Sequence, residues 1–263
     1  MISRRILAHL RNQQWTAIAI DFLIVVAGVF VGIQAANLNG ERIDRRLEQE
    51  YRGRLLADLD AILDNAANQL EFETNKSREV AGALALSALP PSEDKARRLG
   101  QALVATTIRL SPNFESPTFN DLQNSGRLSL IRDPALRRDL STYFARLQYL
   151  RGAIGRNNDN FAEPFVDYLR SQNIGSGFTD ADSAAGVPLA AMEQRIARVA
   201  LKRFGPRDIG AHSTNLNLPV SAPFWEGLRS NLSWRGQGAA ANENLLNLIT
   251  AEARAMKREV ENS

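Results

Sequence analysis

Twenty consecutive residues near the N-terminus, from Trp15 to Gln34, carry only one charged side chain, Asp21. At 1.5 Å per residue, a helix of that length measures about 30 Å, the thickness of the hydrocarbon layer of a bilayer. The indole of Trp15 suits the interface at which such a helix meets the headgroups. We therefore predict a basic tail at residues 1–14, a transmembrane helix at 15–36 and a soluble domain at 37–263.

A cleaved signal peptide is the competing interpretation of this apolar run. The run is long for a signal peptide, and it contains Asp21. No small-x-small cleavage site follows it, because Ala35 is paired with Ile33 and Ala36 with Gln34. These features favour an uncleaved anchor.

The excess of positive charge is confined to the tail. The chain has 32 basic and 29 acidic residues, and its first fourteen residues contain Arg4, Arg5 and Arg11 without any acid. The rest of the chain is therefore neutral, whereas a nucleic-acid-binding domain needs a basic surface. The tail instead resembles a topology signal, and we expect no nucleic-acid partner.

Orientation depends on the basic residues that flank the apolar run. Three arginines precede it, and several arginines mixed with acids follow it between residues 42 and 54. Local counting alone does not decide between the two orientations. Long following domains translocate with little regard to their charge, so we favour a tail inside the cell and a domain outside it.

Asp21 is the most informative residue of the apolar run, because an ionisable group in a membrane helix usually marks a partner or a pathway. It shares a helix face with Gly28 and Gly32, a G-x-x-x-G pair that allows a second helix to approach closely. One interpretation is association with another membrane helix or with a second copy of this chain. The other is that Asp21 reaches the headgroups and the glycines have no special role.

The segment around the apolar run resembles a family of uncharacterised bacterial membrane-anchored proteins that carry a domain of unknown function. Asp21, Gly28, Gln34, Asn37 and Asn39 fall on positions that recur in that family. Two departures are visible, since the acid is usually Glu and an aromatic residue usually stands at the position of Leu38. The resemblance implies anchoring in a bacterial inner membrane and supplies no activity.

A second block, from Thr118 through Leu122 and Gly126 to a helix containing Tyr143, is similar to the middle motif of the same family. The two blocks together cover about fifty residues. The C-terminal half of the chain agrees with the family only in its helical character. The resemblance therefore predicts an architecture and leaves the function open.

The soluble part is predicted to be an all-α helical bundle, because apolar residues recur there at three- and four-residue steps without two-residue alternation. Its first helix continues from the membrane segment and ends at Pro90-Pro91. We place loops near residues 111–132, 171–187 and 205–221. The expected helices begin at Ser92, near Ser116-Pro117, at Asp133-Pro134 (running to Leu169, with Pro164 as a possible kink), at Pro188 (to Phe204), at Phe224 (to Trp234, ended by Gly236 and Gly238) and at Asn242 (to Glu261).

The first helix could also form a coiled coil, but fewer than four clean heptads are visible, so packing inside the bundle is favoured. Carboxylates are frequent on this helix, including Asp58 and Glu73. Bundle di-metal sites add histidines to such carboxylates, and the chain has only His9 and His212, so we expect no metal and no other cofactor. Cysteine chemistry is excluded, since the chain has no cysteine.

Binding residues tend to lie on turn-rich segments, and the richest such segment is 113–133. Its candidate interaction residues are Phe114, Thr118, Phe119, Asp121 and Arg127. The alternative is structural, with Thr118 and Asp133 as helix caps. Residues 157–160, Asn-Asn-Asp-Asn, are a second candidate, either as a polar lining inside the bundle or as an irregular turn next to Gly155.

These observations favour a membrane-anchored interaction or sensing module whose partners are the bilayer and either itself or another membrane protein. A structural spacer is the main alternative. A hydrolase of envelope substrates that uses two carboxylates is a further possibility, and we expect it less than the other two.

Overall fold

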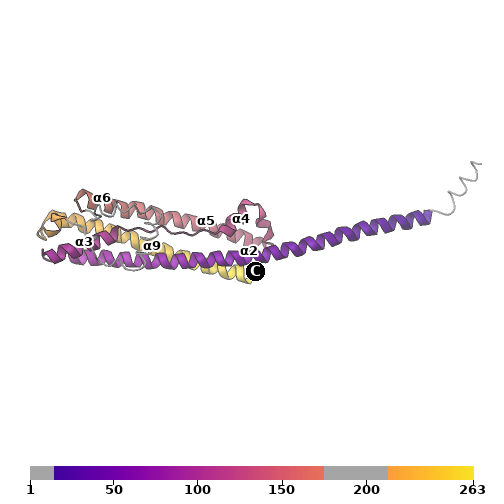
Figure 1. Ribbon diagram of the computed structural model, residues 1–263, viewed down its shortest axis with the longest axis horizontal. Helices are drawn as coiled ribbons and strands as arrows, with labels where there is room; N and C mark the ends of the chain where they lie inside the picture. Colours follow the sequence, from indigo (N-terminus) through magenta and orange to yellow (C-terminus); the bar gives the residue numbers. More distant parts are fainter. Residues whose placement is uncertain (1–14, 175–212) are drawn as a thin grey trace, which may run out of the picture.

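The computed structural model describes residues 15–174 and 213–263, with side chains from Ile20 onward. Within those ranges every regular element is helical and no strand occurs, which confirms the all-α prediction. The basic tail, His212 and the helix predicted at 188–204 lie outside the described residues. Figure 1 shows a long bundle from which one end of α2 projects.

Helix α2 runs from Trp15 to Ser87 without a break and is therefore about 110 Å long. It ends just before Pro90-Pro91, as predicted. Every residue from 20 to 46 is exposed, and we call this stretch the outer half of α2. Residues 47–87, the inner half, pack in the bundle, where Tyr51, Leu55 and Leu59 begin its buried stripe.

Helix α3 (Glu93–Thr107) reverses the direction of the chain, and the Ser92 side chain caps it by accepting a hydrogen bond of 3.1 Å from the backbone N–H of Lys95. An extended segment at 108–116 then continues back along α2. We call α3 and this segment together the return segment of the bundle. It runs from the far end of α2, where Lys95 Nζ donates to the carbonyl of Ser87, to the level of Asp58, which accepts a hydrogen bond from Ser116.

Helix α4 (Pro117–Asn124) and the 3₁₀ turn η1 (Arg127–Leu130) close the near end of the bundle, and α5 (Pro134–Asn157) starts again toward the far end. Ser116 and Asp133 are side-chain caps, each followed by a proline in the first helical turn. Both helix starts were predicted, but Thr118, which was named as a cap, lies inside α4. Gly126 has φ +69°, the left-handed conformation that glycine adopts without strain. This turn therefore needs a glycine.

The helix predicted from Asp133 to Leu169 is not uniform. Helix α5 passes into a π-helical turn, η2 (Asn158–Ala162), and then into α6 (Glu163–Ser171). Pro164 explains the change. Its nitrogen carries no hydrogen to donate, and in an α-helix its ring would clash with the carbonyl of the residue four positions earlier, a conflict that a π turn relieves. The predicted irregularity at residues 157–160 is confirmed.

The last part of the chain consists of the 3₁₀ turn η3 (Thr214–Asn217) and helix α9 (Pro223–Asn262), which returns along the bundle. The prediction that Gly236 and Gly238 separate two helices was wrong. These glycines serve packing, since a Cβ on Gly238 would lie 2.6 Å from the Cβ of Phe161 and one on Gly236 would lie 3.1 Å from Val80 Cγ1. The missing side chains let neighbouring elements approach α9 closely, while α9 itself continues without a break.

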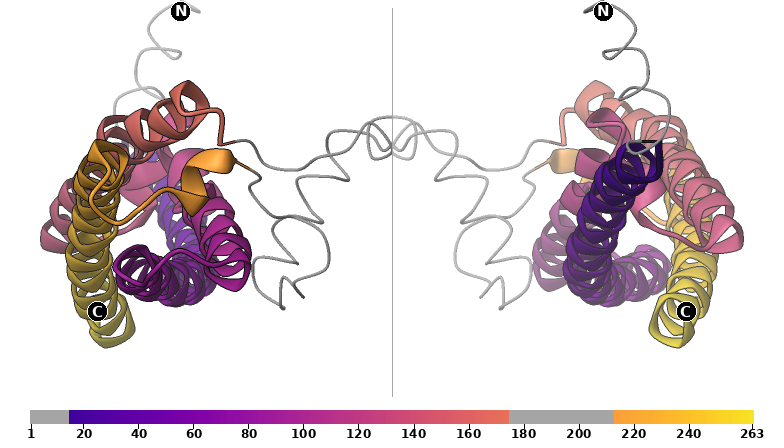
Figure 2. Two further views of the ribbon diagram at one scale, coloured as in Figure 1. Left: turned by 90° about the vertical axis from the view of Figure 1, so that its left-hand side faces the viewer. Right: turned by 90° about the vertical axis from the view of Figure 1, so that its right-hand side faces the viewer.

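Two apolar cores lie end to end along the bundle, which Figure 2 shows from both ends. The proximal core, nearer the outer half of α2, joins α2, α4, α5 and α9, and includes Leu59, Phe119 and Leu246. The distal core joins α2, α3, α6 and α9, and includes Leu99, Phe165 and Trp225. The return segment contributes a helix, α3, to the distal core, whereas it runs as an extended chain along the proximal core and contributes Phe114 there.

Buried residues of α9 recur at alternating three- and four-residue steps over the whole helix, from Trp225 to Val260. The inner half of α2 shows the same spacing from Leu55 to Ser87. This is the heptad spacing of helices that pack nearly parallel or antiparallel over a long distance. The helix pair α2 and α9 therefore forms the spine of the bundle.

Candidate functional site

The outer half of α2 is long and apolar enough to cross a membrane, judged by length and composition, and none of its apolar window is buried against the described part of the chain. Asp21 lies within this exposed stretch. A Cβ built on Gly28 or Gly32 would meet nothing within 4 Å. Within the described part of the chain, nothing covers the face predicted for helix association.

The turn-rich segment at 113–133 packs onto α2. Phe114 and Phe119 belong to the proximal core, and Thr118 is buried with its backbone N–H donating to Asp58 at 2.9 Å. Asp121 is exposed and accepts a hydrogen bond of 2.9 Å from the Tyr51 hydroxyl. Arg127 is exposed as well. Of the five candidate interaction residues, only Asp121 and Arg127 remain accessible to a partner.

Between the two cores lies a layer of buried polar side chains, which we call the polar layer. All of its members are at most 8% exposed. It comprises Gln69, Glu73 and Lys76 of α2, Thr106 of α3, Asn158 of η2, and Arg235 and Asn242 of α9. Buried charge is costly unless it is paired, so each of these groups needs an account of its partners.

Glu73 is the acid of the polar layer. Its Oε1 accepts hydrogen bonds of 3.1 Å from both Gln69 and Asn242, while its buried Oε2 accepts none within the described part of the chain. Burial raises the pKa of the Glu73 carboxyl above its ordinary value, and the positive charge of Arg235 opposes that shift. Glu73 is therefore a desolvated acid with one oxygen free.

The cations of the polar layer hold the return segment in place. Arg235 donates to the carbonyls of Thr106, at 2.9 Å, and Ile108, at 3.3 Å, and Lys76 donates to the carbonyl of Ala105 at 2.7 Å. These carbonyls belong to the C-terminal end of α3, where the helix dipole favours positive charge. Burial lowers the pKa of both cations, and Lys76 is also paired with Glu79 at 2.5 Å.

Three asparagines connect the layer to the π-helical turn. Asn242 donates to Asn158 Oδ1 at 3.3 Å and accepts a hydrogen bond of 2.9 Å from Asn157. Asn157 and Asn158 were predicted to form either a polar lining or an irregular turn. The structure shows the irregular turn, and this turn points Asn158 inward, where it is 8% exposed.

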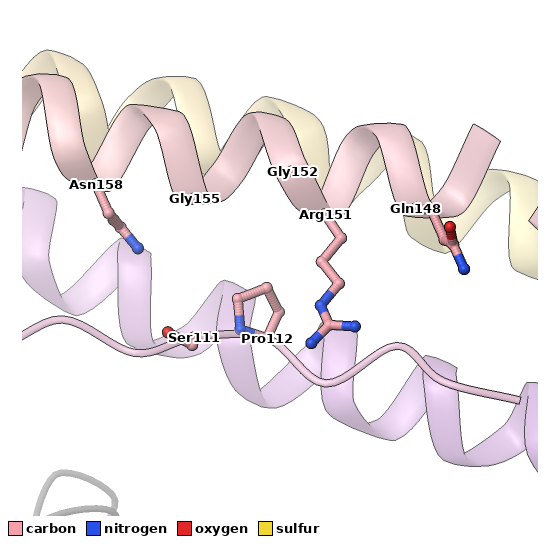
Figure 3. A pocket seen from close by; sticks show the side chains of 7 residues that line it. All are labelled: Ser111, Pro112, Gln148, Arg151, Gly152, Gly155 and Asn158. Atoms are coloured by element: carbon pink, nitrogen blue, oxygen red, sulfur yellow. The ribbon is translucent and has the colours of Figure 1, made fainter. Parts of the chain in front are cut away.

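A groove of about 470 Å³ opens beside Asn158, between α5 and the extended part of the return segment. Figure 3 shows Arg151 reaching across the groove and the amide of Asn158 at its end. Gln148 and Ser111 also line it, and Gly152 and Gly155 form the wall on the side of α5. The absence of side chains at these two glycines leaves space between α5 and the return segment.

Comparisons of the chain with protein families, with curated proteins and with solved structures give no match. The resemblance to bacterial membrane-anchored proteins therefore remains a prediction.

Two members of the polar layer stood out in the sequence, Asn158 as part of a possible polar lining and Glu73 only as a metal ligand. No group of three or more acidic or histidine residues in the described ranges is arranged to hold a metal ion. Arg235 and Asn242 were missed, although the heptad spacing of α9 places both on its buried stripe. A polar residue at a core position of a heptad was the available signal.

Proposed function

We propose that the protein is a single-pass membrane module that associates through its transmembrane helix, with itself or with another membrane protein, and carries its helical bundle outside the bilayer. The observation that carries this proposal is the exposed outer half of α2, whose apolar residues have no cover in the described part of the chain. In water, an apolar stretch of that size is unfavourable, whereas a bilayer satisfies it.

Association, rather than anchoring alone, is supported by the face that Asp21 shares with Gly28 and Gly32. A carboxyl group in the hydrocarbon layer costs a few kcal/mol unless it finds a partner. The two glycines, one turn apart, allow helix backbones to come close enough for a hydrogen bond between helices. A second copy of the chain offers the same face and is the simplest partner.

The proposed location is a bacterial inner membrane, with the basic tail in the cytoplasm and the bundle in the periplasm. Arginines flank both ends of the apolar run, and this orientation is favoured because a long following domain translocates with little regard to its charge. Hydrolysis gains no support from the groove, whose lining offers guanidinium and amide groups in place of the two carboxyl groups that a glycosidase uses.

Native mass spectrometry of the full chain, extracted in mild detergent, tests the proposal. We expect a defined oligomer or a co-purifying membrane protein. Asp21→Leu and Gly32→Leu should each reduce the associated fraction severalfold, and Asp21→Asn should retain part of it, because an amide still forms hydrogen bonds.

The matched control is Ala27→Leu, which enlarges a small residue of the same helix on a different face. It should leave the associated fraction unchanged. A wild-type monomer that carries only lipid would contradict the association proposal and favour a structural spacer. Equal losses from Ala27→Leu and Gly32→Leu would mean that the glycine face has no specific role.

A further inference from the structure

The groove beside the polar layer is lined by hydrogen-bond donors. Arg151 contributes a guanidinium, Gln148 and Asn158 contribute amides, and Ser111 contributes a hydroxyl. None of these groups is an acid, and a guanidinium cannot accept a hydrogen bond. The lining therefore suits a ligand that accepts hydrogen bonds and carries negative charge.

Asn158 is fixed in the orientation that points a donor at the groove. Its side chain is 92% buried, since only 8% is exposed, and its Oδ1 is engaged by Asn242. Asn242 is itself held by Glu73 and Asn157. The remaining Nδ2 of Asn158 donates to no acceptor in the described part of the chain, and Figure 3 shows it facing the space beside Ser111. This amide is accessible from the groove rather than sealed inside the bundle, so an acceptor bound in the groove can receive a hydrogen bond from it.

Arg151 is already paired with a carboxylate of the chain. Its Nη1 donates to the Glu115 carboxylate on the return segment at 3.2 Å. Both side chains are about half exposed, so the pair contributes little to stability and is easily exchanged. A guanidinium binds a planar carboxylate through two parallel hydrogen bonds, and a free carboxylate in the groove can form both.

We propose that this groove binds a small carboxylate-bearing molecule, which replaces Glu115 on Arg151 and accepts a hydrogen bond from Asn158 Nδ2. The volume of about 470 Å³ lies within the range of small-molecule sites. The wall at Gly152 and Gly155 leaves room for the body of the molecule. This inference does not rest on association through the membrane helix, because every residue involved belongs to the bundle.

Succinate is the probe for isothermal titration calorimetry on the full chain in detergent, with inorganic phosphate and succinamide as parallel arms. We expect saturable succinate binding with a Kd on the order of 1 mM, as for a small polar ligand in an open groove. Phosphate should bind more weakly, and neutral succinamide should not bind detectably. Phosphate binding as tight as that of succinate would overturn the carboxylate assignment.

Variants separate the groove from other surfaces. Arg151→Gln should weaken succinate binding about tenfold, and Glu115→Gln should tighten it severalfold by removing the competing carboxylate. The matched control is Arg146→Gln, which also breaks a pair between α5 and another segment, that with Glu252, away from the groove. Equal effects of Arg151→Gln and Arg146→Gln would overturn the proposal, because only general charge would then matter.

Gly155→Leu tests the shape of the groove without threatening the fold, because a Cβ there meets nothing within 4 Å and leucine favours helix over glycine. It should abolish succinate binding, and retained binding would overturn the proposed location. Asp21→Leu should bind succinate as the wild type does, so failure of the ligand site and failure of membrane association are distinguishable.

Discussion

The outer half of α2 leaves every side chain from Ile20 to Arg46 exposed, whereas the inner half places a buried residue against its neighbours at every third or fourth position. Each half also contains an acid on a largely apolar helix. Glu73 finds Gln69 and Asn242 within the same chain, while Asp21 has none of the described residues packed around it. The inner half is therefore complete by itself, and the outer half depends on what surrounds the protein.

The largest expected effect comes from giving the inner acid the situation of the outer one. Arg235→Leu removes the main counter-charge of Glu73 and the donor to two α3 carbonyls, so we expect a loss of about 3–5 kcal/mol in the free energy of unfolding. Urea unfolding of the full chain in detergent, followed by tryptophan fluorescence, measures it. Arg254→Leu, at an exposed position of the same helix, is the control and should change stability by less than about 0.5 kcal/mol.

A loss below about 1 kcal/mol for Arg235→Leu would mean that well-packed apolar groups replace the buried charge, as happens for some buried ion pairs. The polar layer would then be important for the register of the helices rather than for stability.

The same substitution should destabilise the bundle in the inner half and leave its stability unchanged in the outer half. Leu59 is fully buried in the proximal core, and Leu59→Ala should cost about 2–5 kcal/mol of unfolding free energy through the cavity that it leaves. Leu23 is 63% exposed, and Leu23→Ala should leave the urea midpoint of the bundle unchanged. A measurable shift for Leu23→Ala would show that the bundle covers the outer half in solution.

The fold was predictable where local chemistry determines it. Capping side chains and prolines mark the starts of α3, α4 and α5 within a residue or two, and Pro90 lies three residues beyond the end of α2. The continuity of α9 was not predictable, because Gly236 and Gly238 normally weaken a helix. Only the approach of Val80 and Phe161, from distant parts of the chain, explains why they lie inside one.

Apart from Asn158, the polar layer was not predicted as such, for a related reason. Gln69, Glu73 and Lys76 occupy three successive core positions of α2, where they look like an interruption of the apolar pattern or like part of a solvated face. Their partners are remote, since Asn242 is 169 residues from Glu73. A single sequence contains no signal for such pairs, whereas the apolar run of the outer half needs no partner in the chain to be recognised.

The pH dependence of the inner acid sharpens the comparison further. Burial raises the folded-state pKa of Glu73 above the ordinary value of 4.5, so the folded state holds the proton more tightly than the unfolded chain does. The contribution of Glu73 to stability is thus full below pH 4.5 and is lost as the pH rises through the folded-state pKa. Glu73→Gln lacks this titration.

Unfolding free energies of wild type and Glu73→Gln, measured side by side from pH 4 to pH 8, test that prediction. The stability of the wild type relative to the variant should decrease as the pH rises. A relative stability that increases with pH would show that attraction to Arg235 outweighs desolvation and lowers the pKa of Glu73.

The smallest effect compares two glycines of one helix. Gly53, in the inner half, is exposed, and a Cβ there meets nothing within 4 Å, so Gly53→Ala should raise the unfolding free energy by about 0.5–1 kcal/mol through helix propensity alone. Gly28→Ala has equal space, yet it should leave bundle unfolding unchanged and lower the associated fraction measured by native mass spectrometry. If Gly28→Ala also leaves association unchanged, its open surroundings reflect only the absence of neighbours, and the case for a partner helix then depends on Asp21 and Gly32.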